Sequence, residues 1–413
     1  MNHARVEDRI IAPDADSTVW SGLTRWEIAG ALGDIGVLFP IAIALITLCH
    51  MNPTAIFLTA GLGYVLAGSY FRIPIAVQPF KAVAAIALAL QLSPSFVATA
   101  GLLMGALLLL IGLVDVVTPL ARFFSLPIVR GIQLGLGLIL VREGLRLALG
   151  PGSALSMGSG TIIPGWLLAL GAVAILLACL LSDRVPAALA LLGAGIFVGV
   201  LSQSGQLANL AWSPVPLRWL RPQVGELWSV LVILVLPQFA LTFGNSIVAT
   251  ENTAQTLYGP RAQRVTARAL SISIGLMNLL AGAIVGAPCC HGSGGITAHY
   301  KFGARTQRAS YVIGGVCLLL ALFGRSSVAV LALIPTAVLG IFLVYVGVQH
   351  AALLRDIVSK PAHLFVAGCV GVVGAVTTNL TYGFLAGFAV QGALSVVARV
   401  NRKSLLASLP GSE

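Results

Sequence analysis

The sequence predicts an all-α polytopic membrane protein with 14 transmembrane segments, arranged as two inverted halves of seven. Three observations lead to this fold class. Of 413 residues, 58% are hydrophobic and only 9% are charged, whereas a soluble domain carries about 25% charged residues. The apolar residues form runs of membrane-spanning length. Two of these runs are interrupted, at matching places in the two halves.

The apolar runs give the order of the segments, since a spanning helix needs about 20 apolar residues. They lie near residues 25–48, 54–71, 74–91, 95–118, 126–149, 162–181, 186–203, 226–250, 265–286, 292–301, 309–324, 327–349, 362–378 and 380–398. The third and tenth are short or broken. We expect one membrane domain, divided into the segments 1–24 (cytoplasmic), 25–203 (first seven-span repeat), 226–398 (second, inverted repeat) and 399–413 (short cytoplasmic tail).

The few charged residues predict the orientation. With the N-terminus inside, 18 of the 24 Lys and Arg residues fall in inner segments and five in outer ones, while Lys81 lies within a span. Such a bias marks cytoplasmic loops, so we expect a multi-pass protein of the inner (cytoplasmic) membrane with both termini in the cytoplasm. The basic residues are scattered singly, which argues against nucleic acid as a partner. The expected partner of the protein surface is the lipid bilayer.

The two interrupted runs have a similar order of residues. Tyr70–Leu90 reads YFRIPIAVQPFKAVAAIALAL and Val285–Phe302 reads VGAPCCHGSGGITAHYKF. In each, a short proline-led β-like stretch precedes a short helix, and Pro74 and Pro288 are 214 residues apart. Seven spans per half is an odd number, which inverts the second half in the membrane. Paired broken segments in inverted repeats point to a substrate site near the bilayer midplane.

Each half-helix offers backbone donors to an anion, because a helix that begins inside the membrane has free N–H groups and a positive dipole end. The expected donors are Phe80, Lys81 and Ala82 in the first half and residues 293–296 in the second. Glycines at 292, 294 and 295 allow close approach of a ligand. This pattern suits a small oxyanion. The alternative is that the glycines serve close helix packing.

Lys81 is the one basic residue predicted deep in a span, and a charge there is functional by default. It either attracts the anion or pairs with Asp34 of the Gly33–Gly36 stretch. Asp34 itself is either a coupling group for a proton or cation or a cap on a broken first helix.

Span 8 carries a polar stripe on one helical face. Its members are Gln238, Thr242, Asn245 and Ser246, with Glu251 near the inner end. The stripe either faces the cavity or bonds to neighbouring helices, and Glu251 is either a coupling group or solvated. A soft-metal site at Cys289, Cys290 and His291 is not favoured, because no second ligand pair at zinc spacing follows. We expect no metal and no cofactor.

At these residues the chain resembles the molybdate transporters of the sulfate permease superfamily. Three patches carry the resemblance: Gly33 through Pro40, Pro74 through Lys81, and Cys290 through Gly295 running on to Thr306. The resemblance implies a 14-span, 7+7 inverted repeat with core and gate domains, and an anion held between the half-helices of spans 3 and 10. The chain departs from the wider superfamily in two ways. Only residues 400–413 follow Arg399, so we expect no C-terminal regulatory domain, and Asn245-Ser246 stands where related permeases often have an acidic residue before serine.

The sequence-based hypothesis is therefore secondary-active transport of a tetrahedral oxyanion by alternating access, with molybdate as the first candidate substrate and sulfate as the second. The predicted substrate-binding residues are Gln78, Phe80, Lys81, Asn245, Ser246, His291, Ser293, Gly294 and Gly295. The predicted coupling residues, for H⁺ or Na⁺, are Asp34 and Glu251. A nucleobase or aromatic carboxylate permease and an anion channel remain alternatives. An enzyme is not expected, because no third group orients Cys290 and His291. A homodimer is a further expectation.

Overall fold

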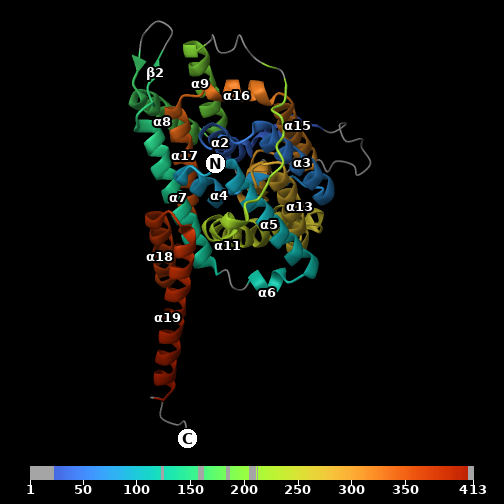
Figure 1. Cartoon of the computed structure of the whole chain (residues 1–413). Coiled ribbons are helices and arrows are strands. Elements are labelled where there is room, and N and C mark those ends of the chain that lie inside the picture. Colours follow the sequence, from blue (N-terminus) through green and yellow to red (C-terminus); the bar gives the residue numbers. More distant parts are fainter. Residues whose placement is uncertain are drawn as a thin grey trace, which may run out of the picture.

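The computed structural model describes residues 23–121, 125–156, 162–182, 187–203, 211 and 213–407. The described part is mostly helical (Figure 1). Its α-helices are α1 (Arg25–Leu32), α2 (Ile35–Leu48), α3 (Pro53–Phe71), α4 (Lys81–Leu90), α5 (Pro94–Val114), α6 (Val117–Ala121), α7 (Leu126–Leu149), α8 (Gly165–Ser182), α9 (Ala187–Gln203), α10 (Leu227–Val230), α11 (Leu236–Leu241), α12 (Ala249–Tyr258), α13 (Ala267–Ala283), α14 (Ser293–Lys301), α15 (Arg308–Leu322), α16 (Gly324–Ala332), α17 (Thr336–Ala351), α18 (Pro361–Thr377) and α19 (Leu380–Ala407). The predicted N-terminal segment lies outside the described residues up to position 22, as does the end of the tail from 408.

Five helices are long and apolar enough to cross a membrane. They are Pro53–Phe71, Pro94–Val114, Val224–Ala262, Thr336–Asp356 and Leu380–Val397. Two bent pairs can each form one more span: α1 with α2, bent by 41°, and α15 with α16, bent by 94°. Each remaining predicted run contains a helix outside this set: α7 is long enough at 24 residues but carries four charged residues, and others, such as α4 and α14, are shorter. The chain is thus a helical membrane protein as predicted, and the count of 14 spans stays a prediction.

The helix Val224–Ala262 is not regular throughout. It joins η3 (Val224–Glu226), α10, η4 (Leu231–Val235), α11, η5 (Thr242–Val248), α12 and η6 (Gly259–Ala262), and η4 and η5 are π-helical. π-bulges inside helices are frequent at functional sites.

The predicted span 327–349 differs from the structure, as does the run 25–48, which is divided into α1 and α2. The run 327–349 was expected to be continuous, but α16 ends at Ala332 and α17 begins at Thr336. Pro335 at the break lacks an N–H group and disfavours helical backbone at the residue before it. α16 therefore turns a corner after α15 instead of continuing into α17.

The two interrupted runs meet in the structure. β1 (Gln78–Pro79) pairs antiparallel with β4 (Cys289–Cys290), with Gln78 opposite Cys290. The N–H group of Phe80 extends the ladder by donating to the Pro288 carbonyl at 2.7 Å. α4 and α14 begin immediately after these strands, so the pairing fixes where both short helices start. β2 (Leu155–Ser156) and β3 (Ile162–Ile163) form a second antiparallel pair, separate from the first.

Helices from the two halves of the chain pack closely against each other: α3 on α15, α5 on α13 and α7 on α17. Small residues make this possible. A Cβ atom on Gly105 of α5 would lie 2.7 Å from the Leu279 nitrogen, and one on Gly144 of α7 would lie 2.5 Å from the Gly340 oxygen. Glycine at such contacts lets membrane helices approach at backbone distance.

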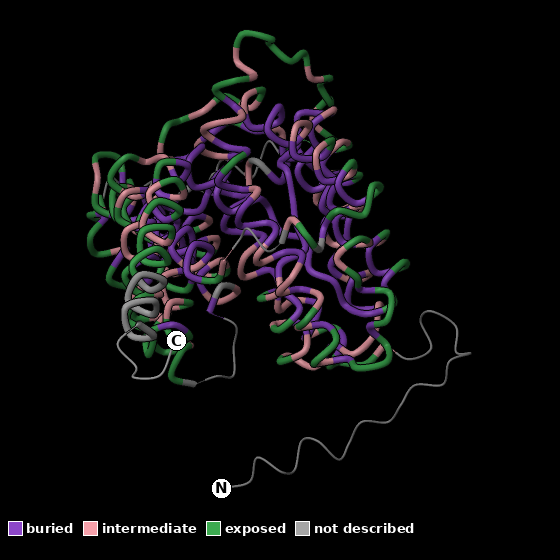
Figure 2. The backbone as a smooth tube through the Cα atoms, turned by 90° about the horizontal axis from the view of Figure 1, so that it is seen from below, coloured by how far each residue is buried: buried purple, intermediate pink, exposed green. Residues whose placement is uncertain are grey.

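Two bodies are visible in the described chain. α7, α8, α9, α17, α18 and α19 pack mainly on one another, and α19 extends away from the rest (Figure 1). The second body holds the remaining spans. Buried residues run through the interior and exposed ones lie along the outside (Figure 2). Only 22% of the apolar part of α19, Leu380–Val397, is buried inside the protein, as expected of a helix that faces lipid.

Candidate functional site

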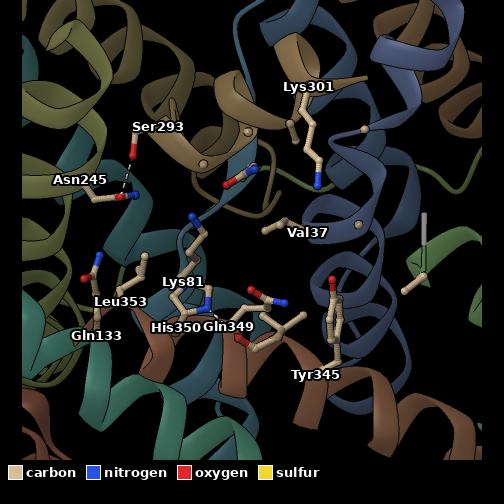
Figure 3. A pocket seen from close by; sticks show the side chains of 18 of the residues that line it. Val37, Lys81, Gln133, Asn245, Ser293, Lys301, Tyr345, Gln349, His350 and Leu353 are labelled. Atoms are coloured by element: carbon tan, nitrogen blue, oxygen red, sulfur yellow. Dashed lines mark hydrogen bonds between the residues drawn. The ribbon is translucent and has the colours of Figure 1, made fainter. Parts of the chain in front are cut away.

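A cavity of about 370 Å³ lies where β1, α4, α14 and the π-helix η5 face α7 and α17 (Figure 3). Its lining residues are Gly33, Gly36, Val37, Gln78, Lys81, Gln133, Cys179, Leu180, Ala187, Leu241, Asn245, Ser293, Gly294, Gly295, Ala298, Lys301, Phe302, Tyr345, Val346, Gln349, His350 and Leu353. One water occupies about 30 Å³ in the liquid. The cavity therefore has room for a small ion with several waters.

The paired strands place the first residue of each short helix at the cavity wall. Lys81 opens α4, is only 6% exposed, and points its ammonium group into the cavity (Figure 3). Ser293 opens α14, and its hydroxyl donates to Asn245 Oδ1 at 3.0 Å. Gly294 follows, and a Cβ atom there would meet nothing within 4 Å. The beginning of α14 is thus bare backbone that faces open space.

The structure corrects the predicted set of backbone donors. The Phe80 amide is used by Pro288, and the Ala82 amide donates to Gln238 Oε1 at 3.0 Å. In α14 the amides of residues 295 and 296 donate to the Gly292 carbonyl at 3.1 and 3.3 Å. Within the described residues, no acceptor is bonded to the amides of Lys81, Ser293 and Gly294. Three free donors therefore remain of the seven expected.

The polar stripe of span 8 is divided between two tasks. Gln238 caps α4 with its carbonyl oxygen and donates from Nε2 to Thr242 at 3.0 Å. Asn245 lines the cavity. Ser246 is buried and hydrogen-bonds the Cys290 thiol instead of facing the cavity. The stripe thus supplies one cavity residue, and its other members hold the short segments in place.

Two further predicted site residues lie behind the cavity wall. Phe80 is 1% exposed and packs in the hydrophobic core. His291 is fully buried: its Nδ1 donates to the Ala76 carbonyl at 2.9 Å, and its Nε2 lies 2.8 Å from Ser273 Oγ. Since both ring nitrogens are occupied, His291 ties the strand pair to α13 and does not contact the cavity.

Asp34 lies between α1 and α2 and is fully buried. It accepts hydrogen bonds from the Tyr64 hydroxyl and from Gln78 Nε2. Among the described residues Asp34 forms no salt bridge with Lys81, the partner that the sequence left open. Glu251, the other predicted coupling group, interacts with the Ala267 amide and is not part of the cavity wall.

Sequence reasoning missed the opposite wall. Gln133 of α7, together with Tyr345, Gln349 and His350 of α17, faces Lys81 across the cavity (Figure 3). Gln133 Oε1 accepts from Arg130 at 2.8 Å, and His350 Nδ1 donates to the Val346 carbonyl at 2.8 Å. The available signal was the presence of amide and imidazole side chains inside apolar helices, because such groups face protein or water, not lipid.

The charges around the cavity have one sign. Lys81 and Lys301 line it, and no aspartate or glutamate does within the described residues. Free amides at a helix N-terminus add positive potential. Such a wall attracts anions and disfavours cations.

The interrupted helical fold and this basic cavity define an anion transporter. Two solved structures share the fold. The transmembrane domain of the cyanobacterial bicarbonate transporter BicA has a TM-score of 0.62 and 17% identity, covering 88% of this chain and 96% of its own. The murine anion transporter Slc26a9, in an inward-facing state, has a TM-score of 0.64 and 17% identity, covering 92% of this chain and 69% of its own.

The chain belongs to the molybdate transporter family, because the family model described as "Molybdate transporter of MFS superfamily" matches residues 26–140 and 231–349. Molybdate transporter 2 of Arabidopsis thaliana is 27% identical over 387 residues, which cover 84% of this chain and 82% of that protein. Molybdate transporter 1 of Chlamydomonas reinhardtii is 28% identical, and the match covers 92% of this chain and 94% of that protein. The predicted family is confirmed, as is a transport function instead of an enzymatic one.

Proposed function

We propose that this protein carries a tetrahedral oxyanion across the cytoplasmic membrane by secondary-active transport. Molybdate is the first candidate for this substrate and sulfate the second. The observation that carries the proposal is the cavity wall: two lysines and three free amides, with no carboxylate among the described lining residues. A tetrahedral dianion accepts hydrogen bonds on all sides and is repelled by carboxylates. Molybdate is proposed ahead of sulfate because the relatives are named molybdate transporters.

The proposed binding groups come from both interrupted segments. The ammonium of Lys81 supplies the charge, and the amides of Lys81, Ser293 and Gly294 supply directed donors. Asn245 fixes the Ser293 hydroxyl at 3.0 Å, and Gly295 keeps the backbone close to Gln78. Phe80, Ser246 and His291, predicted as binding residues, act in this proposal by supporting the wall from behind.

The 7+7 inverted repeat is part of the proposal, and helix pairing supports it. If each half has seven spans, α3, α5, α13 and α15 are spans 2, 4, 9 and 11. A two-fold axis in the membrane plane exchanges span 2 with 9 and span 4 with 11. It therefore converts the contact of α3 with α15 into that of α13 with α5, and both contacts are present. The halves remain assigned to residues 25–203 and 226–398.

The proposed motion is alternating access, with the body of α7–α9 and α17–α19 as the gate and the other body as the core. The cavity lies between them, since Lys81 and Ser293 belong to one body and Gln133 and His350 to the other. Sliding of packed bodies is a common form of domain movement. We further propose that both termini are cytoplasmic, that the protein forms a homodimer, and that transport is coupled to H⁺ or Na⁺.

Uptake into liposomes tests the proposal. Purified full-length protein is reconstituted, and entry of radiolabelled molybdate is followed against protein-free liposomes, with and without excess sulfate, uracil or benzoate. Saturable uptake that sulfate inhibits and the two planar compounds do not is expected. Absence of molybdate or sulfate uptake, together with unchanged thermal stability in either ion, would overturn it. Current without concentrative uptake would assign a channel instead.

A further inference from the structure

Directly behind the anion cavity lies a cluster of buried polar side chains that the binding site does not use. Asp34 and His299 are fully buried, and His299 Nε2 lies 4.0 Å from Asp34 Oδ2. Tyr64 and Gln78 both donate to the Asp34 carboxylate. Gln78 also lines the cavity, so one side chain touches both the carboxylate and the anion site.

Two atoms in this cluster have no hydrogen-bond partner within the described chain: Gln78 Oε1 and His299 Nε2. A buried polar atom without a partner is destabilising and calls for an explanation. Gln78 Oε1 lies on the side of the amide that faces Gly292 and Lys81: a Cβ atom on Gly292 would be 2.6 Å from Gln78 Oε1 and 3.3 Å from Lys81 Nζ. The amide therefore turns its oxygen, an acceptor, toward the side of Lys81, whose side chain lines the cavity.

The protonation state of Asp34 dictates this orientation. An ionised carboxylate only accepts hydrogen bonds, so it holds the NH₂ end of Gln78 and leaves the oxygen facing the cavity. A protonated carboxyl group donates one hydrogen bond and favours the opposite orientation. The amide oxygen then accepts from Asp34, and the NH₂ group turns into the cavity as a donor for the anion.

We propose that Asp34 is a proton-binding site coupled to the anion site through rotation of the Gln78 amide. One proton from water binds the Asp34 carboxylate, the amide turns, and the anion gains two N–H donors beside Lys81. When the anion leaves, the amide oxygen returns toward the Lys81 ammonium and the proton is released. The inference rests on the proposed function and deepens it by naming the coupled ion as a proton. Proton and anion promote each other's binding by the same factor, as thermodynamic linkage requires.

The groups that face Asp34 are consistent with this role. Tyr64 comes from α3, Gln78 from β1, His299 from α14, and the thiols of Cys290 and Cys317 interact with it from β4 and α15. No lysine or arginine forms a salt bridge with it among the described residues. His299 donates from Nδ1 to the Gly30 carbonyl at 2.7 Å, so its Nε2 is the ring nitrogen that faces the carboxylate, 4.0 Å from Asp34 Oδ2. Tyr300 of α14 packs edge-to-face against Tyr258, with the ring centroids 5.3 Å apart.

Calorimetric titration of the purified full-length protein with molybdate tests the inference. Measured in two buffers of different ionisation enthalpy, the heats give the number of protons taken up per anion. For the wild type we expect an uptake approaching one proton and tighter binding at pH 6 than at pH 8, by up to about tenfold per pH unit. Comparison with variants in the same molybdate solutions cancels any proton change of the ligand itself.

Asp34→Asn is the central variant, because an asparagine amide, like a protonated carboxyl group, can donate a hydrogen bond to Gln78, and it does not bind or release a proton. It is expected to bind molybdate with the same affinity at pH 6 and pH 8 and to take up no proton. Gln78→Leu keeps the carboxylate and removes the rotating amide, so it is expected to bind more weakly and without pH dependence. Asp115→Asn is the matched control: Asp115 is an exposed carboxylate that ends α5 with φ of 60°, a conformation asparagine accepts.

Several results would overturn the inference while leaving the proposed function intact. These are binding without proton uptake in the wild type, proton uptake retained in Asp34→Asn, and uptake lost in Glu251→Gln or His299→Asn but kept in Asp34→Asn. Absence of any molybdate binding by the wild type would instead contradict the proposed function. If Asp34→Asn does not fold, the wild type and Gln78→Leu still decide the outcome.

Discussion

The two short helices that open at the cavity contribute to it in different ways. α4 brings a cation, Lys81, but uses the amides of Phe80 and Ala82 for Pro288 and Gln238. α14 brings no charge in its first turn, and its amides at Ser293 and Gly294 are free within the described chain. The two short helices therefore differ: α4 offers a charge and one free amide, that of Lys81, whereas α14 offers two free amides and no charge in its first turn.

This difference explains the side chains next to each helix start. A cation attracts any anion from any direction, whereas backbone donors act only at hydrogen-bond distance and angle. In the proposed site the glycines of α14 allow that approach, while α4 begins with lysine followed by alanine. If the division is correct, substitutions in α14 act through space and shape, and substitutions in α4 act through charge.

The largest effect is expected from a methyl group at Gly295. A Cβ atom there would overlap Ala76 and lie 2.5 Å from Asp34 Oδ1 and 2.6 Å from Gln78 Nε2. Gly295→Ala is expected to abolish molybdate binding and to destabilise the fold by about 1–3 kcal/mol through overpacking. Thermal unfolding and calorimetric titration measure the two effects. Gly294→Ala is the control, because its methyl group enters open space and should leave the melting temperature unchanged. Equal behaviour of the two variants would contradict the assignment of shape to α14.

The next effect is expected at Lys81. A hydrogen bond to a charged group contributes about 1.5–3 kcal/mol, so Lys81→Met is expected to weaken molybdate binding by about 10- to 150-fold. Stability should change little, since the ammonium makes no salt bridge within the described chain. Lys301→Met, at the last residue of α14, is expected to have a smaller effect. A larger loss at Lys301 than at Lys81 would place the anion at the other end of the cavity.

Much of the fold could be predicted from the sequence. The apolar runs gave the helices because a membrane span must be apolar over its whole length, and the prolines near 74–79 and 288 marked the interrupted segments. The pairing of those segments confirms the β-like stretches. Pro335 could have predicted the break between α16 and α17 in the same way. The apolar run that continues across the proline led to one continuous span instead.

The site was harder to predict, because contacts across the molecule decide which polar group faces the cavity. Sequence position placed His291 beside the glycines, yet its two ring nitrogens bond to Ala76 and Ser273. The same limit hid Gln133 and Gln349, which reach the cavity only once α7 and α17 pack across from α4. A sequence shows that a polar residue lies in a span but not which neighbour it meets.

The smallest expected effect separates the side chain of Ser293 from its backbone. Ser293 Oγ donates to Asn245 Oδ1 at 3.0 Å, while its amide is the proposed anion donor. Ser293→Ala removes one neutral hydrogen bond, worth about 0.5–1.5 kcal/mol, and is expected to weaken molybdate binding by about 2- to 12-fold. Thr297→Ala, one turn further along α14, is the control, since its hydroxyl bonds only the Ser293 carbonyl at 3.0 Å and lies outside the cavity wall. Both are measured by titration at one pH. A loss in Ser293→Ala as large as that in Lys81→Met would show that α14 recognises the anion through its side chain, and the contrast between the two helices would then be wrong.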